Sequence, residues 1–256
     1  MKPVPHLPRQ ITLFAVCLLL QAQTRPAELV VMTSGTFTAA HLELAGDFAH
    51  SSTITVTTSA TSMGVGADSI PSRLQRGEPA DVVIVAAEAL DDLIKAGRVI
   101  AGSRVDLARS RIGMAVRSGT PKPDISSVAA LTRTLLNARS VAISSSVSGD
   151  YFSKELFPRL GIAEQMAGKT RPVVGERVGA VVARGEAEIG FQQISELLPV
   201  TGIDLVGPLP SEVQRVTVFA AGVAAQSKHP DAARAYIRFL ASSAATKAVA
   251  KTGLER

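Results

Sequence analysis

Four short segments rich in Ser, Thr and Gly each stand where a predicted strand gives way to a predicted helix. They are TSGTFT at 33–38, SATSMG at 59–64, SSSVSGDY at 144–151 and GERVG at 175–179. A helix start offers free backbone N–H groups and the positive end of the helix dipole, so with nearby hydroxyls it can bind an anion without a Lys or Arg. Because Ser and Thr are also preferred helix N-caps, each segment alone stays open to a purely structural interpretation.

Other kinds of site are poorly supported by the residue spacing. The run GVGADS lacks the third Gly of a dinucleotide fingerprint, and the chain has no GxxxxGK[ST] motif. Residues 60–64 approximate a GxSxG serine elbow with His229 downstream, but the first Gly of that motif is missing. The chain has 4 His without metal-ligand spacing and 1 Cys in an N-terminal apolar run, so we predict no metal and no cofactor.

The composition favours a globular protein with a small ligand. Hydrophobic residues make up 46% of the chain, while aromatic residues make up 4% and Trp is absent, so rings for stacking sugars or bases are scarce. The net charge is +5, from 27 Lys and Arg against 22 Asp and Glu that are scattered among one another. Nucleic-acid binding usually needs a dense basic patch, and we therefore predict no nucleic-acid partner.

The first 27 residues are typical of a secretory signal peptide. Lys2 and Arg9 precede the apolar run ITLFAVCLLL, which gives way to QAQTRPAE. This run is shorter than the roughly 20 residues that span a bilayer. Cys17 lies among Val and Leu rather than small residues, which is a poor context for lipid attachment. We expect a soluble, monomeric protein in the periplasm.

Strand-like and helix-like runs alternate from Glu28 onward, which predicts an α/β fold with mostly parallel sheets flanked by helices. The expected strands are 29–34, 53–59, 81–86, 140–146 and 188–193. The expected helices are 38–50, 69–77, 88–97, 126–138, 151–162, 176–187 and one long helix over 230–253.

Two extended segments, around 105–123 and 212–230, interrupt this alternation. We interpret them as paired hinge segments between two lobes, with the final helix returning to the first lobe. This predicts a discontinuous outer lobe of residues 28–110 and 220–256 and a middle lobe of residues 111–219. A ligand would lie in the cleft between the lobes.

The chain resembles the periplasmic molybdate-binding proteins, the solute-binding components of ABC importers, over essentially the whole mature sequence. The resemblance rests on LVVMTSGTFTAA, RLQRGEPADVVIVA, SSSVSGDYFSKELFPRLGI and GERVGAVVARGEAEIGFQQISEL, of which RGEPADVVI is the most specific part. It implies a two-lobed type II periplasmic-binding-protein fold that closes by hinge motion over an oxyanion. With the hydroxyl-rich segments, it gives the expected ligand-binding residues Ser34, Thr36, Ser62, Ser69, Ser148, Tyr151, Val178 and Gln193.

The chain departs from the molybdate-binding family at two places. Extra residues follow Met63, and Gln193 stands where the family has a tyrosine donor, which indicates a differently shaped anion. The longer loop SMGVGADSIP and the segment FQQISELLP are also similar to a branch of this fold that includes a periplasmic aconitate isomerase.

Two functions follow from these patterns. The leading hypothesis is a solute-binding protein without enzymatic activity, which captures a molybdate-like oxyanion or small carboxylate for import through an ABC permease. The alternative is an isomerase that moves a proton between carbons of a small unsaturated tricarboxylate, for which an acid/base group must reach the proton. Arg73 or Arg177 would pair with substrate carboxylates. The acid/base candidates are Glu176, Asp150, Tyr151 and His41.

Overall fold

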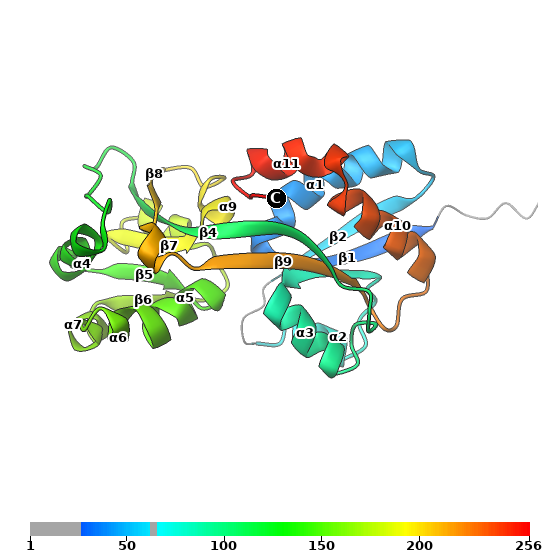
Figure 1. The fold of residues 1–256 in the computed structure, drawn as a ribbon, viewed down its shortest axis with the longest axis horizontal. Coiled ribbons are helices and arrows are strands. Elements are labelled where there is room, and N and C mark those ends of the chain that lie inside the picture. Colours follow the sequence, from blue (N-terminus) through cyan, green and yellow to red (C-terminus); the bar gives the residue numbers. More distant parts are fainter. Residues whose placement is uncertain (1–26, 62–65) are drawn as a thin grey trace, which may run out of the picture.

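The protein consists of two α/β lobes lying side by side and joined by long strands (Figure 1). A computed structural model describes residues 27–61 and 66–256. The predicted signal peptide therefore lies almost wholly outside the described residues, as does Ser62 of the predicted site. The two-lobed α/β fold expected from the sequence is confirmed.

The outer lobe, on the right in Figure 1, contains the N-terminal elements and the last two helices. Its elements are β1 (Glu28–Ser34), α1 (Gly35–Ser51), β2 (Thr55–Thr61), α2 (Ile70–Gln75), β3 (Val82–Ala86), α3 (Ala87–Lys95), β9 (Val216–Val223), α10 (Pro230–Ala241) and α11 (Thr246–Lys251).

The middle lobe, on the left, contains the elements between the long strands. They are α4 (Val128–Asn137), β5 (Val141–Ser144), α5 (Val147–Tyr151), a π-helical turn (Phe152–Leu156), α6 (Phe157–Arg159), α7 (Ala163–Ala167), β6 (Thr170–Val173), α8 (Val178–Ala183), β7 (Ile189–Gln193), α9 (Ile194–Leu197), β8 (Ile203–Pro208) and a 3₁₀ turn (Ser211–Val213).

Strand β4 (Val105–Arg117) belongs to the sheets of both lobes. The strands follow the order β2-β1-β3-β9-β4-β7-β5-β6, and β8 also pairs with β4. Residues 105–111 of β4 pair with β9, whereas residues 112–116 pair with β7, so β4 changes partner where it leaves the outer lobe. The boundaries predicted at 110/111 and 219/220 fall inside β4 and β9 and stay a prediction.

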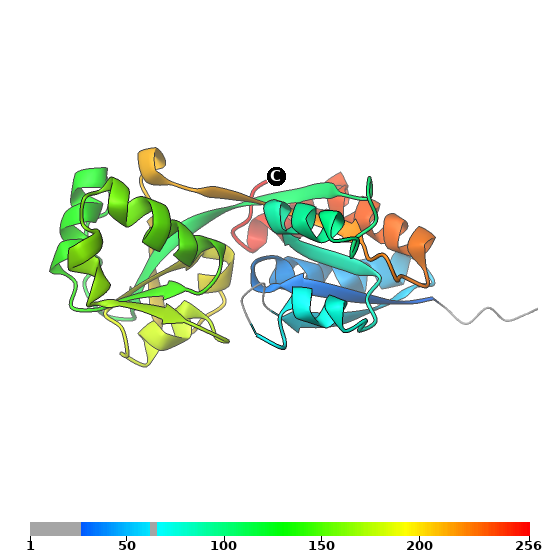
Figure 2. The same ribbon diagram turned by 90° about the horizontal axis from the view of Figure 1, so that it is seen from below.

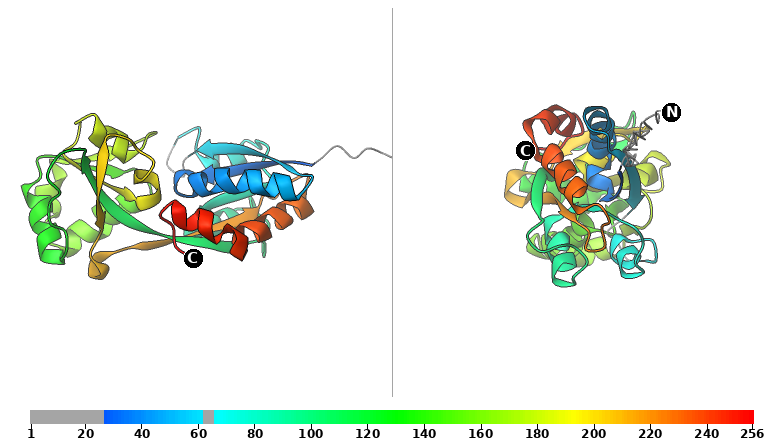
Figure 3. Two further views of the ribbon diagram at one scale, coloured as in Figure 1. Left: turned by 90° about the horizontal axis from the view of Figure 1, so that it is seen from above. Right: turned by 90° about the vertical axis from the view of Figure 1, so that its right-hand side faces the viewer.

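Helices cover both faces of each sheet, as Figures 2 and 3 show from opposite sides. In the outer lobe, one core packs against α1, α10 and α11 and another against α2 and α3. In the middle lobe, the larger core lies under α4 to α7 and the smaller one under α8. Strands covered on both faces are continuously apolar, as in β3, where all of VVIVA is buried.

The prediction of one continuous helix over 230–253 is wrong. Helix α10 ends at Ala241, and Ser242 has an extended conformation, with φ −74° and ψ 165°. A 3₁₀ turn (Ser243–Ala245) then leads into α11. The break lets α10 and α11 follow different paths over the same core. Within residues 27–61 and 66–256, no helix combines the length and hydropathy needed to cross a membrane.

His41 is fully buried in α1, where it holds together three elements of the outer lobe. Its Nε2 lies 2.8 Å from the Thr58 hydroxyl on β2, and its Nδ1 lies 2.7 Å from the Tyr236 hydroxyl on α10. Burial lowers the pKa of His41 to about 4, because a charged imidazole would lose its hydration there.

We expect His41 to make folding pH-dependent. The unfolded chain protonates this residue near pH 6.5, whereas the native protein resists protonation until about pH 4, so the free energy of unfolding falls as the pH falls between these values. The contribution at pH 5 is about 2 kcal/mol relative to pH 7. Urea unfolding at pH 7 and pH 5 should show this loss in the wild type and in the exposed-site control His50→Gln, but a correspondingly smaller loss in His41→Gln. Equal losses in all three would contradict the assignment.

Candidate functional site

All four predicted segments contribute to one cleft between the lobes, with a volume of about 380 Å³. The outer lobe supplies the end of β1 and the start of α1, together with Thr61 of the second segment and Asp68, which follows that segment. The middle lobe supplies the loops that follow β5 and β6 and the end of β7. Because parallel strands end at the same edge of a sheet, separate βα turns gather here.

Three of the predicted binding residues, Ser34, Thr36 and Gln193, line the cleft. Ser34 is 7% exposed, and its hydroxyl has no hydrogen-bond partner within the described chain. Gln193 is 3% exposed; its amide donates to the Thr217 hydroxyl at 3.1 Å, while its Oε1 also lacks a partner among those residues. Buried polar groups are normally paired, so these oxygens are ready to contact a ligand or a water.

Three others lie outside the cleft lining, in the middle lobe. Ser148 is buried in α5. The Tyr151 hydroxyl donates to the Val213 carbonyl at 2.7 Å, and its ring packs in the middle-lobe core. The Val178 N–H, expected to contact the anion, donates instead to Oε1 of Gln192 at 2.8 Å. A side chain of the protein thus takes the place expected for the ligand at the start of α8.

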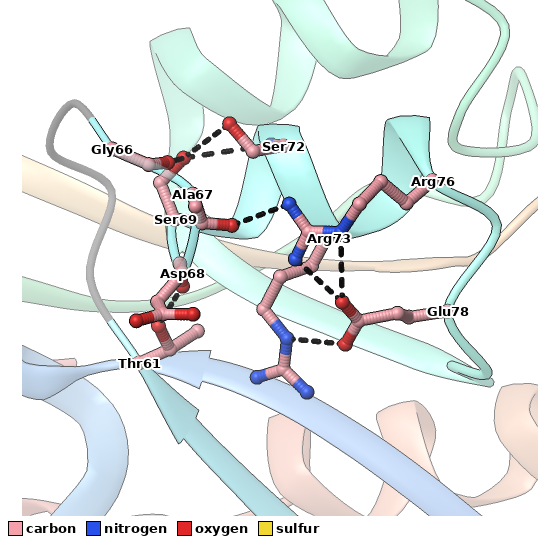
Figure 4. Close-up of polar contacts among 9 residues, drawn as sticks. All are labelled: Thr61, Gly66, Ala67, Asp68, Ser69, Ser72, Arg73, Arg76 and Glu78. Carbon is pink, nitrogen blue, oxygen red and sulfur yellow. Dashed lines mark hydrogen bonds and ion pairs between the residues drawn. The ribbon is translucent and has the colours of Figure 1, made fainter.

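Ser69 caps a helix in the structure (Figure 4). Its hydroxyl donates to the Gly66 carbonyl at 2.9 Å and accepts a hydrogen bond from the Ser72 N–H at 3.4 Å. Nearby, Arg73 pairs with Glu78 at 2.6 Å. The described part of the extended loop therefore closes on itself, and neither Ser69 nor Arg73 lines the cleft.

Of the predicted acid/base candidates, Glu176 alone lines the cleft. Both of its carboxylate oxygens accept hydrogen bonds from Arg184 at 2.9 Å, and these bonds lower the pKa of Glu176. Asp150 is exposed and pairs with Lys154 at 3.0 Å, and His41 and Tyr151 are buried in the lobe cores. Each of these side chains already forms an ion pair or a hydrogen bond with another residue of the protein.

Glu196, which the sequence analysis did not single out, is a further carboxyl group in the cleft. It lies on α9, lines the cleft and is partly buried. Thr36 of the outer lobe donates a hydrogen bond to its Oε2 at 3.1 Å. Burial raises the pKa of Glu196 to about 7, while Thr36, the charge of Arg177 and the Gln192 side chain partly offset this effect. The sequence feature that could have identified Glu196 is its position just after the EIGFQQ strand, at the start of a helix. A Glu in the first turn of a helix usually interacts only with the helix dipole or the N-cap, so this position does not by itself indicate a site.

The cleft therefore joins a group that exchanges protons near neutral pH to groups that attract carboxylates. Arg177 lines the cleft and forms no ion pair with any residue in 27–61 or 66–256. The start of α1, with its 17 residues, adds a helix dipole from the opposite lobe. No group of His, Cys, Asp and Glu within the described ranges is arranged to hold a metal ion.

Comparison with known proteins agrees with this architecture. Residues 29–255 match the family model described as bacterial extracellular solute-binding protein. A related protein, aconitate isomerase from a Pseudomonas species, is 51% identical over 196 residues, which cover 77% of this chain and 75% of the relative. The resemblance to a branch that includes such an isomerase is confirmed.

Two solved structures share the fold at low sequence identity. The periplasmic molybdate-binding protein of Azotobacter vinelandii has a TM-score of 0.71 and 19% identity, covering 89% of this chain and 99% of that chain. The sulfate-binding protein of Mycobacterium tuberculosis H37Rv has a TM-score of 0.69 and 19% identity, covering 89% of this chain and 86% of that chain.

We expect Glu196→Gln to stabilise the protein more at pH 8 than at pH 5. The native carboxyl titrates near pH 7 and the unfolded one near 4.5, so the stability contributed by Glu196 is present below pH 4.5 and is lost as the pH rises through 7. Removing the charge should raise the free energy of unfolding by up to about 2 kcal/mol more at pH 8 than at pH 5, a figure reduced to allow for the partial exposure of Glu196. Urea unfolding at both pH values measures this, and Glu176→Gln is the matched control without such a gain. A stability difference independent of pH would contradict the raised pKa.

Proposed function

Because this chain belongs to the family of bacterial extracellular solute-binding proteins, we propose that it binds a small unsaturated tricarboxylate in the interlobe cleft and isomerises it, as an aconitate isomerase. The observation that carries this proposal is the Glu196 carboxyl, which faces the cleft and has a pKa of about 7. The 51% identity to a protein named aconitate isomerase supports it. The sequence alone ranked this function second, and Glu196 reverses the order.

The reaction is a shift of one proton along the C–C=C unit of aconitate. The Glu196 carboxylate takes a proton from the CH₂ group, and the C–H electron pair becomes the new C=C bond. The electrons of the former double bond are held as a carbanion delocalised into the substrate carboxylates. Protonated Glu196 then gives the proton to the far carbon of the former double bond, at the other end of the C–C=C unit. This completes the shift of the double bond and restores the Glu196 carboxylate.

The remaining cleft groups bind the substrate carboxylates and the charge that builds on them. Arg177 supplies a guanidinium from the middle lobe, and the start of α1 supplies a helix dipole from the outer lobe. The Ser34 hydroxyl, which has no hydrogen-bond partner among residues 27–61 and 66–256, lies at the same edge. Donors already in place where negative charge develops stabilise a transition state without reorganisation.

We predict that the purified mature protein interconverts cis- and trans-aconitate. Proton NMR in D₂O would follow the isomer ratio and any deuterium that enters from solvent. Glu196→Gln should lower kcat at least about 100-fold, because a general base contributes 10²- to 10⁴-fold to rate. In the wild type, kcat/KM should rise with pH through about 7 as Glu196 loses its proton.

The matched control is Glu176→Gln, which removes a carboxylate from the same cleft but one already paired with Arg184. It should retain wild-type kcat within a few-fold. A wild type that binds aconitate but leaves the isomer ratio unchanged would rule out the isomerase. Equal losses in both variants would argue for a general effect of cleft charge.

The second candidate is capture of a small anion for import through an ABC permease, without chemistry. The hydroxyl-rich segments that line the cleft favour it, and so does the shared fold of molybdate- and sulfate-binding proteins. In either case we place the protein in the periplasm, since residues 1–27 are typical of a signal peptide.

A thermal-shift screen separates the two ligand classes. We expect aconitate and citrate to raise the unfolding temperature, because a ligand that binds only the native state stabilises it. Molybdate, tungstate and sulfate should have smaller effects, since these oxyanions carry no hydrogen that could face the Glu196 carboxylate. A larger shift with molybdate, together with no isomerisation, would favour import.

A further inference from the structure

We propose that Gly35 and Thr36 are positioning residues: they form a recess at the start of α1 that receives the Glu196 carboxylate when the two lobes close. This inference rests on the proposed isomerase function and assigns to the outer lobe a role in the reaction that the sequence did not indicate. Glu196 belongs to the middle lobe, so neither lobe alone holds the acid/base group in its working position.

The absence of a side chain at Gly35 makes room for Glu196. A Cβ at this position would collide with Oε1 of Glu196 and lie 3.3 Å from its Cδ. The backbone does not need a glycine here, because Gly35 is not among the residues with positive φ and forms the first residue of a regular helix. Glycine is unfavourable within helices, so the space it leaves for the carboxylate is its evident use.

Thr36 supplies the directed contact. Its hydroxyl donates to Oε2 of Glu196 at 3.1 Å, and its side chain is buried at the interface of the lobes. A hydrogen bond to the ionised carboxyl favours that form and therefore opposes the effect of burial on the pKa. In this arrangement Thr36 both orients the base and keeps part of it ionised near neutral pH.

The other charged groups of the cleft do not replace this contact. Arg177 acts on Glu196 through its charge, without a hydrogen bond between the two in the described chain. Glu176 is paired with Arg184, and Asp68 lies on the outer-lobe side of the cleft and is exposed. The Gln192 side chain also acts on the carboxylate, but it belongs to the middle lobe, so from the outer lobe the orientation of the carboxylate depends on Gly35 and Thr36.

The test compares Gly35→Ala and Thr36→Val with Thr36→Ser and Thr38→Val. Thr38 lies on the same helix but donates to the Ser34 carbonyl at 3.0 Å, so Thr38→Val removes a buried hydroxyl that does not touch Glu196. Gly35→Ala should lower kcat about 100-fold, because a misplaced base slows the proton transfer. KM should stay near the wild-type value. The unfolding temperature should be unchanged or higher, because alanine favours a helix more than glycine does. Thr36→Val should raise the apparent pKa in kcat/KM by about one pH unit, and Thr36→Ser and Thr38→Val should not.

A second measurement does not depend on activity. Carbon-13 NMR of protein labelled at the Glu side-chain carboxyls would follow the signal that Glu196→Gln removes, with and without tricarballylate, a saturated tricarboxylate that cannot isomerise. A higher titration midpoint in Thr36→Val, unchanged in Thr38→Val, supports the recess. The same titration midpoint in all variants, both with and without tricarballylate, would overturn the proposed recess. A wild-type kcat in Gly35→Ala would overturn it as well. A wild type that fails to isomerise aconitate would instead overturn the proposed function, and the NMR midpoints would still decide the role of Thr36.

Discussion

The sharing of β4 between two sheets is the constraint on which the rest of the structure depends. Each lobe has its own apolar cores, and the single strand β4 pairs first with β9 and then with β7. The lobes can therefore move relative to one another only by bending at the crossing strands, which preserves both cores. Because the strand ends of both sheets face the same space, every closing motion brings the βα turns of one lobe towards those of the other.

The burial of Glu196 between the lobes lowers the stability of the folded protein and raises the pKa of this carboxyl. A carboxyl whose pKa is raised to about 7 by burial destabilises the folded protein whenever it is ionised. The apolar cores of the two lobes tolerate that cost, since they are built from strands such as β3 that are buried along their whole length. A group that titrates near the working pH is also the most effective acid/base group, so in the proposed reaction the burial that weakens folding would also favour proton transfer by Glu196.

Much of the fold could be predicted from the sequence, but the decisive carboxyl could not. The alternation of strands and helices, the long segments containing β4 and β9, and the turns that line the cleft all follow from local pattern. By contrast, β6 and α9 have only 4 residues each, and β8 carries little periodic signal. Glu196 and Gly35 are far apart in the chain and unremarkable in local sequence, and only the packing of α9 against α1 across the two lobes brings them together. Ser69 had a strong local signal, which its role as a helix cap explains fully.

The proposed function also predicts how this cleft should differ from one built for a fully ionised oxyanion. Such an anion only accepts hydrogen bonds, so its site must present free donors. Here the Val178 N–H already donates to Gln192, and the Thr36 hydroxyl already donates to Glu196. Two donors that the resemblance assigned to the anion are thus satisfied by acceptors of the protein. In the proposed reaction, the substrate brings a carbon-bound hydrogen towards Glu196, while its charged ends lie near Arg177 and the start of α1. A polycarboxylate with a carbon-bound proton between its charges has that distribution; a tetrahedral oxyanion does not.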